Sequence, residues 1–285
     1  MNKSNNLNLP LAIYNAARND AYRRGNSDIT VTQLISPPQL VELSRRHDAD
    51  ITVDCSDMLY ALMGTAMHHI LDRAQDKASV MKEHRLYLKV NDWLVSGQFD
   101  RLDTATGELG DYKFASVWEA IYGLKPEREA QLNLLAHLCR RNNFTVNKLQ
   151  VIYLFRDWSK TKALQGGDYP QHQIAVIEVP MWPEDQAAAY LTERVQAHQN
   201  ARNGLALPQC SNAERWAKPT VYAVMKTGRK SAVKLHDNEA AAQTHAKAEA
   251  GGYVQIRPGE NTRCASYCQA AQFCPQFEAL KEAQA

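Results

Sequence analysis

The sequence predicts a mixed α/β (α+β) fold, in which helices cover a mixed sheet and a small unit follows at the carboxyl end. Residues 84–116 show the two-residue alternation of strands, and the segments on either side show helical spacing. The composition shifts after residue 204. A series of helix, three strands, helix and strand is typical of a mixed sheet with helices packed on it.

The amino-terminal third is predicted to be mostly helical. Residues 9–25 have helical spacing and end at Gly25, a residue type favoured just after a helix. The short segment 29–35 is rich in β-branched residues, and the proline pair that follows it begins a helix over 37–47. The next helix covers 56–74, with Ser56 or Asp57 as its cap.

Three strands are expected next. Apolar and polar residues alternate along 84–90 and 93–103, and the segment 107–116 follows a turn. The turns are expected at Asn91-Asp92 and around Thr106-Gly107. The segments that complete this part are a helix over 116–142 broken near Gly123 and Pro126, strands over 148–158 and 171–180, and a helix over 183–204.

A small unit is expected at the carboxyl end. Its predicted elements are a hairpin over 221–236, a helix over 237–252 and a third strand over 253–259. The natural boundary lies at Asn203-Gly204, which gives a first domain of residues 1–204 and a tail of residues 205–285 with an inserted ββαβ unit.

The bulk composition is that of an ordinary globular protein. The chain has 285 residues, of which 45% are hydrophobic and 22% charged, and its formal net charge is +2. The polar amino terminus lacks the apolar region of a signal peptide, and no apolar run is long enough for a membrane span. We therefore expect a cytoplasmic protein without membrane contact, in which six cysteines need an explanation other than disulfides.

The hairpin over 96–116 carries the first chemical signal. Asp111 and Lys113 share one face of a strand, and Asp100 lies on the preceding strand that can pair with it. Two facing carboxylates repel each other, and a divalent cation such as Mg²⁺ or Mn²⁺ removes that repulsion. The competing interpretation is a row of Asp and Lys ion pairs on the protein surface, which would contribute little to stability.

The helix over 56–74 adds a second signal. Gly64, His68 and Asp72 are spaced four residues apart and share one helix face, so His68 could reach the same cation and Gly64 permits close approach to the sheet. His69 lies about 100° further round the helix and is expected to point elsewhere. Gln131 on the helix after the lysine strand would need hydrogen-bond partners if it faces a cleft.

These motifs, in the order G-x-x-x-H-x-x-x-D, G-x-x-D-R-x-D, D-Y-K and Q-L, resemble the RecB-type branch of the PD-(D/E)XK nuclease superfamily over 31–203. The resemblance implies a restriction-endonuclease-like core with Lys113 as the catalytic lysine and Gln131 as an active-site residue. The metal ligands that it implies are His68, Asp100, Asp111 and the backbone carbonyl of Tyr112. Leu135 stands where this family usually has a tyrosine. Arg101 and Asp103 also match the family pattern, and the alternative interpretation of these two residues is a local ion pair that shapes the hairpin.

The cysteines predict a second metal site. Cys264, Cys268 and Cys274 lie within eleven positions, and Cys210 lies upstream. Their spacing is unlike the C-x-x-C pairs of zinc ribbons, and a cysteine followed by proline occurs in iron–sulfur runs. Similar RecB-type nucleases, among them CRISPR-adaptation nucleases and helicase–nucleases of the AddB type, bind a [4Fe–4S] cluster with four cysteines. Zinc and reduced thiols are the alternatives, and Cys55 is the alternative to Cys210.

A basic turn is the candidate DNA contact. Lys226, Arg229 and Lys230 gather in the tail hairpin, where they would contact phosphates or form a solvated surface. The predicted function is that of a metal-dependent deoxyribonuclease, a stand-alone exonuclease of phage or mobile-element type in recombination or end processing. The alternatives are a DNA-binding subunit that works through partners, such as a recombination or single-strand-binding protein, and a CRISPR-adaptation-like nuclease in a complex. Polarity and oligomeric state stay open.

Overall fold

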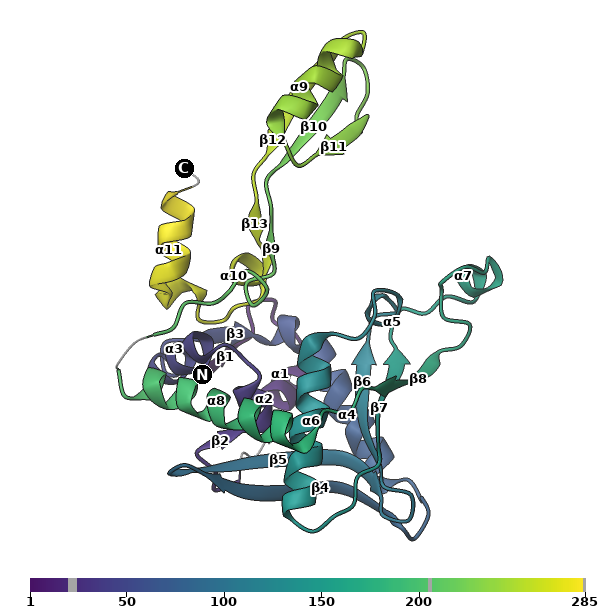
Figure 1. Ribbon diagram of the computed structural model, residues 1–285, viewed down its shortest axis with the longest axis vertical. Helices are drawn as coiled ribbons and strands as arrows, with labels where there is room; N and C mark the ends of the chain where they lie inside the picture. The colour runs from purple at the N-terminus through teal and green to yellow at the C-terminus, as the bar shows by residue number, and fades with distance from the viewer. Residues whose placement is uncertain (20–24, 205–206, 284–285) are drawn as a thin grey trace. The chain divides into compact units, whose positions relative to one another are not determined.

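The structure is a computed structural model that describes residues 1–19, 25–204 and 207–283 and divides into two compact units. The first unit comprises Met1–Pro38 and Thr52–Ala206, and the second comprises Gln39–Ile51 and Leu207–Ala285. The predicted fold class is confirmed, because the first unit contains a mixed sheet flanked by helices (Figure 1). The second unit contains the ββαβ arrangement.

The sheet of the first unit has the order β2-β5-β6-β7-β8, with β4 paired to β5 as well. Its strands are β2 (Ile29–Thr30), β4 (Val80–Val90), β5 (Trp93–Asp103), β6 (Glu108–Ala115), β7 (Lys148–Phe155) and β8 (Ile174–Val179). Strands β6 and β7 run parallel, whereas β4, β5 and β6 form an antiparallel series. The predicted turns are confirmed by left-handed backbone at Asn91 and Gly107, with φ angles of 51° and 73°.

The helices of the first unit follow the predicted pattern only in part. The short helix over 160–164 was not predicted, and neither Ser56 nor Asp57 caps the helix that carries His68, because Asp54 caps a 3₁₀ turn that precedes it. The helices of this unit are α1 (Leu11–Arg18), α2 (Val31–Leu34), α4 (Leu59–Arg73), α5 (Trp118–Ile121), α6 (Pro126–Arg141), α7 (Lys160–Leu164) and α8 (Glu184–Arg202). The first predicted helix ends at Arg18, and its remainder reaches residues 20–24, which lie outside the described part. Segment 29–35 is strand only at its start, because Thr30 caps α2 and accepts a hydrogen bond from Gln33.

Helix α6 packs on the sheet with one side and lines the cleft with residues near its amino-terminal half. It packs against β4, β5, β6 and β7 and also against α8. A Cβ atom at Gly97 would lie 2.6 Å from Leu135 Cδ2, so only glycine lets α6 approach β5 this closely. Within the described residues, no helix is both long and apolar enough to span a membrane.

A short pair of strands and a 3₁₀ turn precede α4. Strand β1 (Asn2–Ser4) runs parallel to β3 (Thr52–Asp54), and the turn η1 (Cys55–Met58) leads into the helix. Asp54 fixes this start, because its carboxylate accepts hydrogen bonds from Ser56 and from Ser4. The entry to the helix that carries His68 is thereby tied to the amino terminus.

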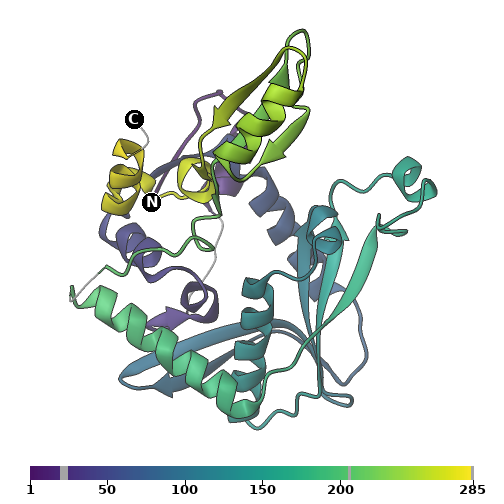
Figure 2. The same ribbon diagram turned by 45° about the horizontal axis from the view of Figure 1, so that its top comes forward.

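The second unit has little apolar packing. Its small sheet has the order β11-β10-β12, and α9 lies against it (Figure 2). Among the described residues of this unit, Val224, Ala242 and Ala246 form the one cluster of buried apolar side chains. Its elements are α3 (Pro38–Arg46), β9 (Ala217–Lys218), β10 (Val221–Lys226), β11 (Lys234–His236), α9 (Glu239–Ala248), β12 (Gly252–Arg257), β13 (Glu260–Asn261), α10 (Thr262–Ser266), η2 (Ala271–Phe273) and α11 (Pro275–Glu282).

Candidate active site

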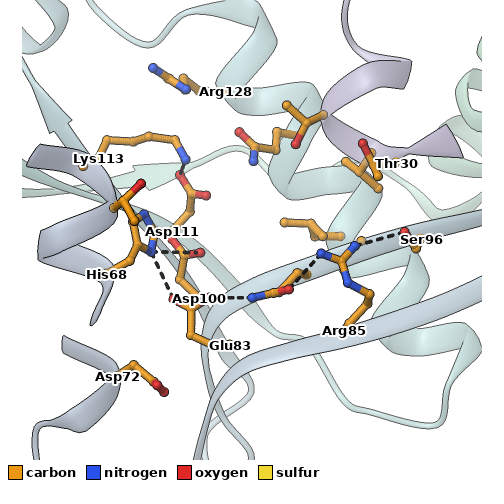
Figure 3. A pocket seen from close by; sticks show the side chains of 18 of the residues that line it. Thr30, His68, Asp72, Glu83, Arg85, Ser96, Asp100, Asp111, Lys113 and Arg128 are labelled. Carbon is orange, nitrogen blue, oxygen red and sulfur yellow. Dashed lines mark hydrogen bonds and ion pairs between the residues drawn. The ribbon is translucent and has the colours of Figure 1, made fainter. Parts of the chain in front are cut away.

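A cleft of about 670 Å³ opens in the first unit and collects most of the residues singled out in the sequence (Figure 3). Its walls come from α4, β4, β5, β6 and α6. The sequence-predicted residues that line it are His68, Asp72, Asp100, Asp111, Lys113 and Gln131. Four segments distant in sequence therefore converge on one cavity.

The pairing of β5 with β6 brings Asp100 to Asp111. Arg101 pairs with Gly110, so the next step of the antiparallel register sets Asp100 opposite Asp111. The backbone N–H of Tyr112 donates to Asp100 Oδ2 over 2.7 Å. Burial, and then the charge of Asp111, raise the pKa of Asp100 to about 7. The fold therefore holds two carboxyl groups together at an electrostatic cost.

Lys113 stands beside the second carboxylate. Its Nζ lies 2.5 Å from Asp111 Oδ2, and both side chains are largely buried. Alternation along β6 sets these two residues on one face, as predicted. The ion pair fixes the lysine ammonium inside the cleft, where Figure 3 shows it between Asp111 and Arg128.

His68 joins the carboxylates from α4. Its Nδ1 lies 3.0 Å from Glu83 Oε1 and 3.6 Å from Asp100 Oδ1. The hydrogen bond with Glu83 and the charge of Asp100 raise the pKa of His68, although burial opposes them. Among the described residues, His68, Glu83 and Asp100 form the one group of three such side chains whose ligand atoms all lie within 4.8 Å of each other.

Glu83 is a site residue that the sequence analysis missed. It lies in β4 opposite Asp100, between the pairs Lys82–Arg101 and His84–Phe99. Its φ angle is +47°, a strained value for a strand residue other than glycine. No local pattern could have identified it, because its role depends on the pairing of two strands.

A polar chain extends from Glu83 along the sheet. Gln98 Nε2 donates to Glu83 Oε2 over 2.7 Å, and Arg85 donates to Gln98 Oε1 over 2.8 Å and to Ser96 Oγ over 3.0 Å (Figure 3). Each side chain in this chain fixes the orientation of the next. The Glu83 carboxylate is thereby held toward His68 rather than toward solvent.

The α6 side of the cleft carries Arg128, Gln131 and Leu135. The Nε of Arg128 is buried and has no hydrogen-bond partner among the described residues. Leu135, at the position where a tyrosine was noted as usual, packs on Gly97. This wall of the cleft thus carries one cationic side chain, Arg128, and one amide side chain, Gln131.

Two expectations about α4 are wrong. His69 also lines the cleft, although it was expected to point elsewhere, because the cavity is wide enough to reach two neighbouring faces of the helix. A Cβ atom at Gly64 would meet nothing within 4 Å, so this glycine is not needed for close approach to the sheet.

Tyr112, Arg101 and Asp103 do not line the cleft. The ring of Tyr112 lies edge-on to His68 with centroids 6.5 Å apart, while its N–H supports Asp100. Arg101 contacts Asp103 at 3.8 Å and Asp76 at 3.5 Å. The geometry of this pair is that of the local ion pair considered as the alternative.

The second unit brings four thiols to one small cavity of about 20 Å³. Cys210, Cys264, Cys268 and Cys274 line it together with apolar side chains of α3. Burial first, and then the charges of Glu214 and the other three thiols, raise the pKa of Cys210 to about 12. Gln276 clamps Cys210 through hydrogen bonds of 2.8 and 2.9 Å with its backbone N–H and C=O.

Two cysteines lie elsewhere. Cys55 belongs to the first unit, where it is buried and its thiol contacts Asn5 Oδ1 at 3.5 Å. Cys139 is buried in α6, and burial raises its pKa to about 12. Both have the surroundings of structural thiols.

The basic turn lies between β10 and β11. Lys226 pairs with Glu249 at 3.4 Å, and Arg229 contacts Ser231 at 3.4 Å. Arg229 and Lys230 are exposed. The turn thus presents two accessible cations of the three predicted DNA contacts.

Comparisons with known proteins leave the family open. No family model matches the chain, and no curated protein matches it. One similar solved structure is described as "Crystal structure of SSO0001", with a TM-score of 0.46 and 15% sequence identity. The similarity covers 65% of this chain and 84% of that one.

Proposed function

We propose that this protein is a metal-dependent deoxyribonuclease of the PD-(D/E)XK type. One observation carries the proposal: His68, Glu83 and Asp100 gather within 4.8 Å, and the Asp111–Lys113 pair lines the same cleft. The residues come from separate segments whose order along the chain resembles the RecB-type motifs. Neither the His68–Glu83–Asp100 group nor the Asp111–Lys113 pair would be needed to hold the sheet together.

The donor set fits a hard divalent cation. Carboxylate oxygens and one imidazole suit Mg²⁺ or Mn²⁺, and a bound cation would reduce the repulsion from Asp111 that, after burial, raises the pKa of Asp100. The residues that would hold the ion are His68, Asp100 and Asp111, with Glu83 as the added ligand. A bound cation would polarise a phosphodiester and lower the pKa of a water molecule.

The side chains around the ion would orient the attacking water, take part in proton transfer and bind the phosphate. Asp111 holds the Lys113 ammonium in place, so that it can orient an attacking water and stabilise charge that develops on phosphate oxygens. The Tyr112 N–H holds Asp100, and Gln98 holds Glu83. Arg128 and Gln131 on the opposite wall would bind the phosphate oxygens.

The cysteine cavity supports a soft metal group as structural cofactor. A cysteine followed by proline, as at Cys274-Pro275, is typical of iron–sulfur runs and favours a [4Fe–4S] cluster, with zinc as the alternative. Cys210, Cys264, Cys268 and Cys274 would hold it.

The role that follows is DNA end processing by an exonuclease of phage or mobile-element type. The test uses linear duplex and single-stranded DNA labelled at either end, with Mg²⁺, Mn²⁺ or EDTA. We expect cleavage that EDTA abolishes, and a loss of about 10²–10⁴-fold in Lys113→Ala. Lys89→Ala, at an exposed lysine on β4, is the matched control and should cleave normally. Absence of cleavage by folded, metal-loaded wild type would refute the proposal.

A further inference from the structure

Helix α5 presents two aromatic side chains to solvent, just after the strand that carries Lys113. Trp118 and Tyr122 are 47% and 82% exposed. Their rings stack on each other, with centroids 5.5 Å apart and planes inclined by 21°. The neighbouring Ala120 and Ile121 pack against the core, so the buried side of α5 does not include this pair. An exposed aromatic pair of this kind is not explained by folding.

The pair is held in a fixed position. At the start of α5, Asp157 accepts hydrogen bonds from Ser116 Oγ over 2.6 Å and from the Val117 N–H over 2.8 Å. At the end of α5, Gly123 has a φ angle of +87° and reverses the chain. A preorganised aromatic surface loses little conformational entropy on binding.

A salt-bridge chain connects α5 to the cleft. Glu119, next to Trp118, lies 3.5 Å from Arg128 Nη2 and 3.1 Å from Lys125 Nζ. Arg128 lines the cleft opposite Lys113 (Figure 3). The short helix that carries the aromatic pair is therefore tied to the wall of the cleft through the Glu119–Arg128 ion pair.

A cation and a further exposed ring are tied to the end of β6, three residues before Trp118. The Arg156 guanidinium lies 4.1 Å from the ring centre of Tyr60, which is 58% exposed. The Arg156 N–H donates to Ala115 O, the residue that ends β6. The two acidic groups nearby, Glu119 and Asp157, are already engaged by the cations and donors named above. Cations interleaved with exposed rings fit a nucleic-acid strand.

We propose that the Trp118–Tyr122 pair is a stacking platform for an unpaired nucleobase of the DNA strand that enters the cleft. This inference rests on the proposed nuclease function. In a duplex the base faces are covered by neighbouring bases, so only a single strand or a frayed end can use such a platform. The platform therefore assigns single-stranded DNA as the preferred substrate class.

Binding of a short fluorescent single strand to Lys113→Ala protein, which is expected not to degrade it, tests the platform. In this background, Tyr122→Ala should weaken single-strand binding by about 5- to 150-fold, the range of one lost base stack, and should change duplex binding less than about twofold. Tyr122→Phe should bind as the parent does. The matched control is Tyr267→Ala, since Tyr267 is 69% exposed and adjoins Trp216 at 5.3 Å in a similar pair.

Abasic substitution along the strand adds a readout that a structural role would not move. One abasic position should weaken binding to the parent as much as Tyr122→Ala does, with no further loss in the variant. Unchanged single-strand binding in Tyr122→Ala, equal loss in Tyr267→Ala, or additive abasic losses would overturn the inference and leave the pair as a protein-binding surface. If wild type cleaves no DNA while the predicted binding pattern holds, only the nuclease function fails.

Discussion

The two units hold their candidate metal ligands on very different amounts of apolar packing. The carboxylate cluster lies on strands whose other residues belong to a large buried core that includes Phe99 and Leu109. The cysteines lie on short elements, in a unit whose small sheet and α9 form a buried apolar cluster of Val224, Ala242 and Ala246. The fold of the first unit therefore forms the carboxylate cluster, and we propose that the second unit depends on a metal group held by its four cysteines to stay folded.

The largest expected effect concerns the cysteine unit. Cys268→Ser should remove a ligand and expose the second unit to proteolysis, because structural metal sites contribute on the order of 10 kcal/mol. Limited proteolysis with mass spectrometry should find new cleavage sites within 207–283 and none in the first unit. Ser266→Ala, two residues before Cys268 at the end of α10, is the control. If the second unit of Cys268→Ser resists proteolysis as well as that of wild type, the two units do not differ in their need for a metal group.

Removal of a ligand from the carboxylate cluster is expected to stabilise the metal-free protein, unlike removal of a cysteine. Asp100→Asn should abolish cleavage yet stabilise the metal-free protein at pH 8 by about 2 to 4 kcal/mol, because it removes a buried charge facing Asp111. The pKa of Asp100 is raised from 3.8 to about 7, so the destabilisation by its ionised form appears as pH rises through this window. Urea denaturation in EDTA measures it, with the exposed Asp92→Asn as control. A less stable Asp100→Asn would contradict the account.

Two glycines beside the cleft should respond differently to alanine. A Cβ atom at Gly97 would press on Leu135, Val31 and Leu138, so Gly97→Ala should lower the free energy of unfolding by about 2 kcal/mol. A Cβ atom at Gly64 meets nothing, and Gly64→Ala should be neutral or stabilise α4 by about 0.5–1 kcal/mol. Chemical denaturation of both variants distinguishes them, and equal effects would refute the packing argument.

The smallest effect concerns acid stability of the first unit. Burial, and then the charge of Arg194, lower the pKa of His198 to about 4. The unfolded chain binds this proton more readily, so stability is full above about pH 6.5 and is lost as pH falls toward 4. At pH 5.5 the loss from this group is about 1 kcal/mol, and His198→Gln should remove it from the difference between pH 7 and pH 5.5. An unchanged pH dependence in the variant would contradict this assignment.

Local patterns predicted the fold and part of the site. Alternation set Asp111 and Lys113 on one strand face, and helical spacing set His68 and Asp72 on one helix face. Both periodicities are properties of single segments, so they can be read without knowledge of the neighbours. The turns at Asn91 and Gly107 were predicted for the same reason.

What depended on pairing or packing between segments could not be predicted. Glu83 enters the site only because β4 pairs with β5 and because its backbone adopts a strained φ angle. The width of the cleft, which admits His69, depends on how α4 and α6 flank the sheet. The platform at Trp118 and Tyr122 has helical spacing that is equally typical of a buried face.

Manganese binding tests the central claim most directly. Electron paramagnetic resonance of Mn²⁺ titrated into metal-free protein reports the free ion, and binding removes its signal. The account predicts that wild type, Lys113→Ala and Asp92→Asn bind Mn²⁺, and that Asp100→Asn binds it at least about tenfold more weakly. If folded wild type leaves Mn²⁺ free, or if Asp100→Asn binds it equally well, the carboxylate cluster is not the metal site of a nuclease.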